Sequence, residues 1–110
     1  MTIFAKIINR EIPADIVYED DQCLAFKDIS PQAPMHVLLI PKQAIAKLTD
    51  TNEEHKHLLG HMMVKAGEIA KQQGHDEFRV VINNGAGVGQ SVFHLHLHLL
   101  AGRGFQWPPG

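Results

Sequence analysis

The chain has little of several residue types that mark large classes of protein. Its only cysteine, Cys23, excludes a disulfide framework and a cysteine-based zinc cluster. Ten lysines and arginines stand against 12 aspartates and glutamates, a balance that lacks the basic excess of proteins that bind nucleic-acid polymers. No apolar run approaches the ~20 residues of a membrane span, and the N-terminus has no secretion signal. We therefore expect a soluble cytoplasmic protein that binds neither nucleic-acid polymers nor membranes.

What the chain does have is enough apolar sequence for one core and an unusual number of histidines. Apolar residues make up 45% of its 110 positions, which suits a single domain over residues 1–110. Eight histidines are present. Three of them, His94, His96 and His98, alternate with leucines. Alternation by two is the period of a β-strand, so all three imidazoles are expected on one face, about 6.6 Å apart along the strand. The leucines between them then face the core.

The rest of the chain predicts an α+β fold. Thr2 can cap a short helix, and Ile12-Pro13 marks the end of that segment. A capping box at Thr51 and Glu54 is expected to begin a long helix, with Gly74 as its stop. Strands are expected over residues 16–19, 23–27, 35–41, 78–83 and 94–100, with the first two joined by a tight turn at 20–21. Short connections require antiparallel neighbours, so we expect a five-stranded antiparallel sheet with one long and one short helix.

The remaining histidines are more ambiguous. His36 is the one polar residue of the apolar segment 35–41, and it has a functional meaning only if that segment lies beside the histidine strand. His57 and His61 have the i, i+4 spacing that can chelate a metal on a helix. Because no third ligand is apparent in the sequence, we interpret them as residues of the exposed helix face.

A glycine-rich loop at 84–91 precedes the histidine strand. Its glycines permit main-chain N–H groups to turn toward an anion, and it ends on Gln90 and Ser91. Imidazole has an ordinary pKa of about 6.5, so one cluster can supply a neutral nucleophile and protonated hydrogen-bond donors. This combination favours metal-independent phosphoryl or nucleotidyl transfer without a cofactor. His-x-His spacing also suits zinc, copper or nickel, so the spacing alone leaves a metal-binding protein open.

The segment His94 to Leu100 matches at every position the motif His-φ-His-φ-His-φ-φ, where φ is apolar. On this motif the chain resembles the histidine-triad family, and its flanking sequences resemble the Hint branch, the purine nucleoside phosphoramidases. The flanks that carry the resemblance are residues 2–4, 11–14, 28–34, 89–92 and the closing Trp107-Pro108-Pro109-Gly110. They cover nearly the whole chain.

The resemblance implies an enzyme that cleaves the P–N bond of adenosine 5′-monophosphoramidates, and possible action on aminoacyl adenylates. His96 would attack the α-phosphorus and carry the nucleotide covalently, before water releases AMP. His98 would contact the α-phosphate and the bridging nitrogen, while His36 completes the cluster and His94 supports the rings. Ser91 would help to protonate the departing amine. A nucleotide-binding regulatory module with incidental turnover stays as an alternative.

The resemblance also implies a nucleotide-binding set and a partner. Asp28 would accept the ribose hydroxyls. The apolar slot for the purine of AMP or GMP conjugates would be formed by Ile29, Phe4, Ile7, Phe26 and Leu38. Contacts on the phosphate side would come from Asn83, Gly89, Gln90 and Ser91, with His96 and His98. The resemblance further implies a homodimer whose C-terminal tail reaches the partner's site. Two departures from the family pattern are Phe93, where tyrosine is usual, and Val88, where glycine is common.

Overall fold

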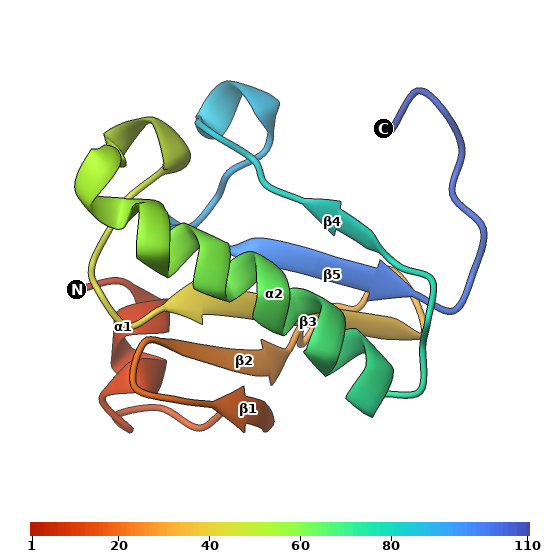
Figure 1. Cartoon of the computed structure of the whole chain (residues 1–110), viewed down its shortest axis with the longest axis horizontal. Coiled ribbons are helices and arrows are strands. Elements are labelled where there is room, and N and C mark those ends of the chain that lie inside the picture. Colours follow the sequence, from red (N-terminus) through yellow and green to blue (C-terminus); the bar gives the residue numbers. More distant parts are fainter.

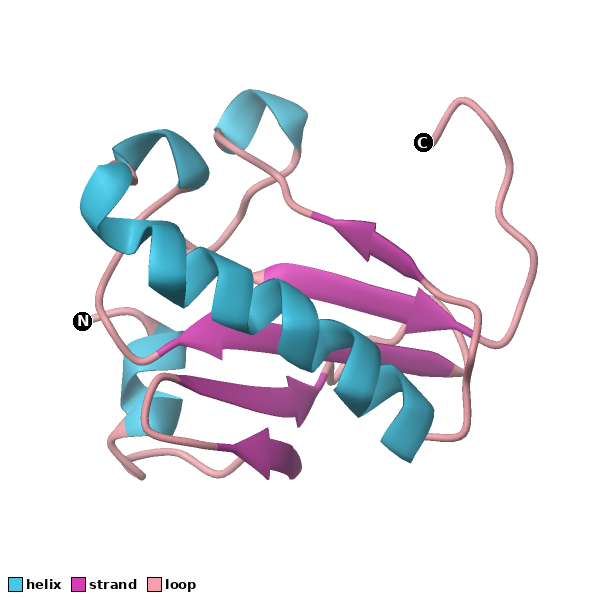
Figure 2. Ribbon diagram, in the orientation of Figure 1, coloured by secondary structure: helices cyan, strands magenta, loops and turns pink.

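The computed structural model describes all 110 residues and places a five-stranded antiparallel sheet between two helices (Figures 1 and 2). The strand order is β1-β2-β3-β5-β4, so the last strand lies inside the sheet. This arrangement confirms the expected α+β class, with one long and one short helix. The elements are α1 (Ile3–Ile8), β1 (Ile16–Glu19), β2 (Cys23–Lys27), β3 (Met35–Pro41), α2 (Lys56–Gln72), β4 (Arg79–Val81) and β5 (Leu97–Ala101), with short 3-10 turns η1 (Leu48–Asp50), η2 (Glu53–His55) and η3 (Ala86–Val88).

The two faces of the sheet carry two separate cores, because successive side chains of a strand point to opposite faces. Met35, Val37 and Leu39 of β3 pack in a cluster of 12 buried residues that includes the inner face of α2. Leu38 and Ile40 pack instead with Phe4 and Ile7 of α1 and with neighbours on β2. Every residue of β3 is buried, as its nearly continuous apolar sequence predicts for a covered strand. The α1 face is the one that also carries His36.

Helix α1 begins where the sequence predicts. The Thr2 hydroxyl accepts a hydrogen bond from the Ala5 N–H at 3.1 Å, which satisfies one free donor of the first turn. The apolar side of this short helix is held against the sheet by Phe4 and Ile7, both buried.

The start of α2 differs from the prediction. Asn52, rather than Thr51, is the capping residue, and it caps the 3-10 turn η2 that leads directly into α2: its side chain accepts from the Glu54 N–H, and His55 Nδ1 accepts from the Asn52 N–H. The Thr51 hydroxyl is not free to cap, because it donates to the Leu48 carbonyl and closes η1. The end of the helix is as expected, since Gly74 adopts φ +91° just beyond Gln72.

Two strands are shorter than predicted. β4 covers Arg79–Val81 instead of 78–83, and β5 begins at Leu97 instead of His94. The chain before Leu97 is outside the ladder, and there the Leu95 N–H donates to the Ile45 carbonyl, beyond the end of β3, at 2.7 Å. No helix in the structure is long and apolar enough to cross a membrane.

Candidate functional site

Pairing of β3 with β5 brings two histidines from distant parts of the chain together. Leu38 lies opposite His98 in the antiparallel register, and His36 lies two residues before Leu38 on the same face of β3. Both imidazoles therefore point to the α1 face, where His36 Nε2 and His98 Nδ1 are 2.9 Å apart. His36 was expected to have a functional meaning only if its segment lay beside the histidine strand, and β3 does pair with β5.

The third ring of the cluster belongs to His96. Its centroid lies 5.0 Å from that of His98, and the His98 centroid lies 5.2 Å from that of His36. Phe4 of α1 meets His96 edge-on at 5.1 Å and limits the movement of the ring. His94 is buried as well, at 6.3 Å from Phe4, but its own ring nitrogen is directed away from the other three.

The hydrogen bonds of His94 and His96 fix where their protons are. His94 Nε2 is 2.8 Å from the Pro41 carbonyl and His96 Nδ1 is 2.8 Å from the His94 carbonyl. A carbonyl oxygen only accepts, so both nitrogens must carry the proton. In a neutral His96 the other nitrogen, Nε2, then keeps an unshared electron pair. The structure gives that nitrogen no hydrogen-bond partner.

The protons of His36 and His98 are fixed in the same way, through a main-chain N–H. Gln32 N–H donates to His36 Nδ1 at 3.0 Å, so the proton of a neutral His36 lies on Nε2. That proton points at His98 Nδ1, which must accept it. The remaining proton of His98 is consequently on Nε2. The two neighbouring rings of the site thus present opposite groups: an electron pair on His96 and an N–H on His98.

Burial favours the neutral forms of His36, His94 and His98. It is the main cause that lowers the pKa of His98 to about 4, assisted by the charges of His96 and His36. Burial likewise lowers the pKa of His36, against a smaller opposing effect from Asp28, and lowers the pKa of His94. The neutral forms of His36 and His98 preserve the proton pattern of this pair near neutral pH.

A cavity of about 280 Å³ opens beside His96 and His98, between α1 and the sheet. Its walls are mainly apolar and include the five residues expected for a purine slot, Phe4, Ile7, Phe26, Ile29 and Leu38. Asp28 and Ser91, two of the expected polar residues, also line it. The wall further contains Ile3, Ile12, Pro13, Ala14, Lys27 and Val92, which were not among the predicted site residues.

Asp28 is oriented by its own turn. Its Oδ1 accepts from the Ser30 N–H at 2.8 Å, while Oδ2 is 3.5 Å from His36 Nε2. Ile29, the next residue, has a fully exposed side chain at the cavity rim. A carboxylate and an exposed apolar side chain therefore stand together at the entrance.

The other loop residues that were expected on the phosphate side lie next to the cavity and do not line it. Gln90 is buried, and its side-chain amide bridges the Gly85 N–H and the Ala46 and Val92 carbonyls. This side chain shapes the loop, and the main-chain N–H of Gln90 is also occupied, since it donates to the Gly85 carbonyl at 3.1 Å. Gly89 has φ +106°, which a residue with a side chain rarely adopts, and Asn83 lies against it.

The two departures from the family pattern lie outside the cavity. Val88 is exposed in η3, and Phe93 is exposed on the wall of a second hollow, of about 600 Å³. That larger hollow lies between α1 and residues 42–46 and includes His94, but neither His96 nor His98. The smaller cavity is the better candidate site because it holds the free His96 nitrogen and the Asp28 carboxylate.

Sequence reasoning missed the main-chain groups that set the proton pattern. The Gln32 N–H and the Pro41 carbonyl act through the backbone, and every residue but proline has an N–H. No residue type marks such a group in a sequence. Only the register of β3 and β5 could have pointed to them.

Comparison with known proteins gives one family and several relatives. The family described as "Scavenger mRNA decapping enzyme C-term binding" matches residues 1–105. An uncharacterised HIT-like protein of Synechocystis sp. is 66% identical over 110 residues, covering 99% of this chain and 96% of that protein. A Brassica juncea protein named "14 kDa zinc-binding protein" is 53% identical over 112 residues, covering 99% of both chains.

Solved structures show the same fold over the full chain. The crystal structure of a HIT family hydrolase from Legionella pneumophila is 47% identical, with a TM-score of 0.97 and full coverage of both chains. A histidine triad nucleotide-binding protein from Candida albicans is 32% identical, with a TM-score of 0.77, covering 100% of this chain and 85% of that one.

Proposed function

Since the chain belongs to the histidine-triad (HIT) family, we propose that it is a nucleotidyl hydrolase that cleaves the P–N bond of purine nucleoside 5′-monophosphoramidates. The observation that carries the proposal is the unshared electron pair on His96 Nε2, beside a cavity of nucleoside size with a carboxylate at its mouth. The Legionella relative is named a hydrolase and the Candida relative a nucleotide-binding protein, which supports this class of reaction.

In the first step His96 Nε2 attacks the α-phosphorus, and the bond from phosphorus to the amine nitrogen breaks. The His94 carbonyl stabilises the positive charge that develops on the ring, because it accepts a hydrogen bond from Nδ1. A bond between His96 and the nucleotide now exists. In the second step water attacks the same phosphorus, the nucleoside monophosphate leaves, and His96 recovers its electron pair.

The departing amine needs a proton. His98 Nε2–H is the donor that the hydrogen-bond pattern leaves free, and it is suited to donate a hydrogen bond to the leaving nitrogen while solvent supplies the proton that the amine takes up. The exposed hydroxyl of Ser91 lies at the same cavity and is a second donor. The same groups stabilise the phosphate oxygens as charge builds on them.

The cavity walls match a purine nucleoside. The apolar side chains of Phe4, Ile7, Phe26 and Leu38 form a slot for the base, with Ile29 at the rim. Asp28 keeps one carboxylate oxygen near the histidines and is suited to accept hydrogen bonds from the ribose hydroxyls. The slot has no polar group that distinguishes adenine from guanine, so the proposal covers both AMP and GMP conjugates.

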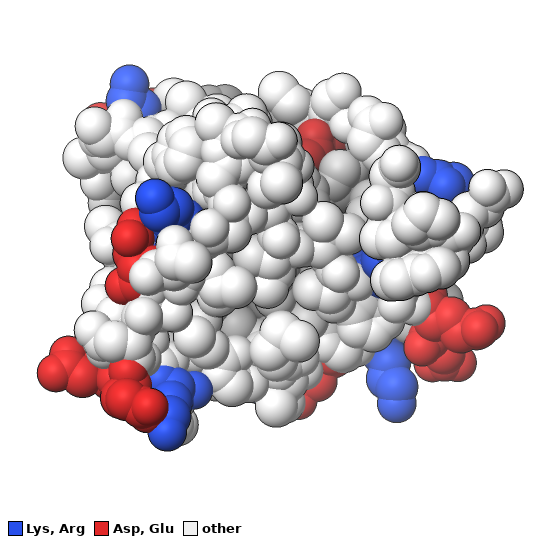
Figure 3. Space-filling view, turned by 90° about the horizontal axis from the view of Figure 1, so that it is seen from above, with Lys and Arg blue, Asp and Glu red and all other residues white.

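The proposed functional unit is a homodimer joined through β4. This edge strand pairs only with β5, so its outer N–H and C=O groups are free to extend the sheet. Next to it an apolar groove of about 160 Å³ runs under α2, lined by Leu59, Met63 and Ile82 among others. The face seen from this side has few charged residues at its centre (Figure 3). A second copy of the chain fits an uncharged face with an open strand edge.

The test uses adenosine 5′-monophosphoramidate and the variants His96→Ala and His57→Gln. The former is expected to lose turnover by at least about 10⁴-fold while it still binds AMP. The latter, an exposed helix residue, is the matched control and is expected to turn over normally. Acid quenching followed by intact mass measurement should show one nucleotidyl group on the wild-type chain. Turnover that survives in His96→Ala would rule out the covalent step.

A regulatory nucleotide-binding module would give a different result: AMP would bind, but physiological phosphoramidates would turn over no faster than with the His96→Ala variant. A metal centre in the triad is the other alternative, since ligand atoms of Asp28, His36 and His98 lie within 4.8 Å of one another. Activity that requires a stoichiometric metal and disappears with a chelator would favour that alternative.

A further inference from the structure

Three side chains with metal-ligand atoms meet on the α2 face of the sheet, opposite the histidine triad. Asp20 belongs to the turn between β1 and β2, Cys23 begins β2, and His61 projects from α2. The Asp20 Oδ2 atom is 2.6 Å from His61 Nε2 and 3.6 Å from Cys23 Sγ. All three ligand atoms lie within 4.8 Å of one another. His61 is therefore not simply an exposed helix residue, as the sequence suggested.

The turn itself aims the carboxylate at this point. Asp20 Oδ1 accepts hydrogen bonds from the Gln22 and Cys23 N–H groups at 2.7 and 2.9 Å, which leaves Oδ2 for the cluster. The Tyr18 hydroxyl donates to the same Oδ2 at 2.6 Å. The Asp20 carboxylate is thus held in place by main-chain N–H groups of its own turn.

The Asp20 carboxylate gives this point a negative charge. Burial opposes ionisation of Asp20, but hydrogen bonds from Tyr18, the turn N–H groups and His61 outweigh it and hold the pKa well below its usual range. Burial, then the Asp20 charge, raises the pKa of the Cys23 thiol to about 12. The amine of Lys65, one turn beyond His61, is bound to Glu68. A carboxylate and a buried, soft sulfur atom are thus adjacent, and a metal cation would pair with both.

We propose that Asp20, Cys23 and His61 form a zinc site that is separate from the triad. One thiolate, one imidazole and one carboxylate are a donor set that zinc prefers over magnesium or calcium. Ligands of a tetrahedral zinc at 2.0–2.3 Å lie about 3.3–3.8 Å from one another. Opening the Asp20–His61 contact by less than about 1 Å is enough to admit the ion at that geometry. Water or the Tyr18 hydroxyl completes the fourth position.

Binding requires a definite movement of protons. The Cys23 thiol releases its proton to solvent, and His61 carries its ring proton on Nδ1 so that Nε2 can bind the metal. The hydrogen bond between Asp20 and His61 is replaced by two bonds to zinc. The Asp20 and His61 side chains are 24% and 20% exposed, so the ion can enter from solvent even though Cys23 is fully buried. The bound ion would join the first hairpin to the long helix.

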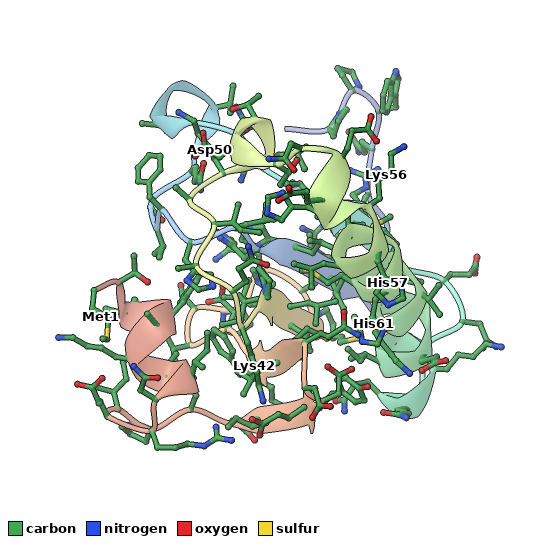
Figure 4. All side chains as sticks on the ribbon, turned by 60° about the vertical axis from the view of Figure 1, so that its left-hand side comes forward. Met1, Lys42, Asp50, Lys56, His57 and His61 are labelled. Carbon is green, nitrogen blue, oxygen red and sulfur yellow. The ribbon has the colours of Figure 1, made fainter.

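The experiment measures zinc binding to the purified full chain by calorimetry, and metal content by elemental analysis after dialysis against Zn²⁺. The variants are Cys23→Ser and His61→Gln, with His57→Gln as the matched control on the same helix (Figure 4). His98→Asn reports whether the triad holds the ion instead. Cobalt(II) gives a second readout, because a thiolate ligand produces a charge-transfer band that imidazole and carboxylate ligands do not.

The expected result is one zinc per chain in the wild type, in His57→Gln and in His98→Asn. Binding should weaken by about tenfold or more in Cys23→Ser and in His61→Gln. A wild type that binds no zinc, binding that changes less than threefold in both site variants (about 0.7 kcal/mol), or binding that is lost in His98→Asn would overturn the proposal. If Cys23→Ser fails to fold, the cobalt band of the wild type and the affinity of His61→Gln decide.

Discussion

His96 differs from the other histidines of its cluster in the ring nitrogen that it leaves unbonded. Its Nδ1 is tied to the His94 carbonyl, whereas His36 and His98 are bonded to each other and His94 is bonded to Pro41. These bonds leave an electron pair on His96 and an N–H on His98. No charged side chain contacts His96 Nε2. At the scale of single residues, therefore, the main chain decides the chemistry as much as the imidazoles do.

Gln32 gives the sharpest test of this dependence. Its N–H fixes the tautomer of His36, and only proline removes an N–H while keeping the chain. In Gln32→Pro we expect kcat on a phosphoramidate to fall by about 10- to 100-fold with KM nearly unchanged, because His98 loses its oriented proton. Gln32→Ala keeps the N–H and is the control. Equal loss in both variants would show that the side chain, and not the tautomer, matters.

His98 makes a second prediction, on stability. Its pKa in the folded protein is about 4, below the ordinary value of 6.5, because burial opposes its charge. Between those two pH values the unfolded chain binds a proton that the native chain does not. The stability that neutral His98 contributes is therefore fully present above pH 6.5 and is lost progressively as the pH falls toward 4. The total loss from this group is on the order of 2 kcal/mol. His36 and His94 act in the same direction.

Urea unfolding at fixed protein concentration between pH 7.5 and 4 measures this effect. The variant His98→Asn removes the titrating ring and should show a flatter dependence than the wild type. A wild-type free energy of unfolding that stays constant, or rises, as the pH is lowered through 6 would contradict the assignment of neutral buried rings.

At the scale of elements, the site depends on where β3 starts and β5 ends. Gly102 follows β5 with φ +95°, and Pro34 precedes β3. A Cβ atom at Gly102 would lie 2.7 Å from the Pro34 Cβ, which real side chains do not tolerate. The close approach of these two segments holds the Gln32–His36 turn against the end of β5, as does a hydrogen bond from Arg103 Nε to the Gln32 carbonyl.

Gly102→Ala should consequently destabilise the fold by about 1–3 kcal/mol, through a strained φ and the clash with Pro34. Gly104→Ala is the matched control, because a Cβ there meets no atom within 4 Å and no positive φ is required. Its unfolding free energy should change by no more than about 0.5 kcal/mol. Thermal and urea unfolding of both variants measure the difference, and equal stability of the two would contradict this role for Gly102.

The sequence predicted the elements better than their ends. Alternating and continuous apolar patterns gave the strands and the long helix, since these depend on local periodicity. The place of His36 came instead from the family resemblance, because no local pattern shows which strands pair. The predicted capping residue ahead of α2 and the predicted start of β5 were wrong, because Thr51 binds Leu48 and Leu95 binds Ile45. Such competing partners depend on how distant segments pack. The Asp20–His61 contact joins residues 41 positions apart and leaves no periodic signal.

At the scale of the whole molecule, the single tryptophan reports on assembly. Trp107 is 85% exposed in the isolated chain and lies in the tail that follows β5 (Figure 1). If the tail packs on a partner subunit, as the proposed dimer requires, Trp107 is shielded from water in the dimer. Its fluorescence should then shift to longer wavelength on dilution, in step with the change of mass seen in analytical ultracentrifugation. An emission spectrum that does not change when the dimer dissociates would show that the tail is not part of the interface.

The strict alternation of β5 also constrains how this protein can evolve. One inserted or deleted residue between His96 and Leu99 would exchange the two faces of the strand, driving imidazoles into the α2 core and leucines into the cavity. Descendants can therefore replace amino acids in this segment but cannot change its length.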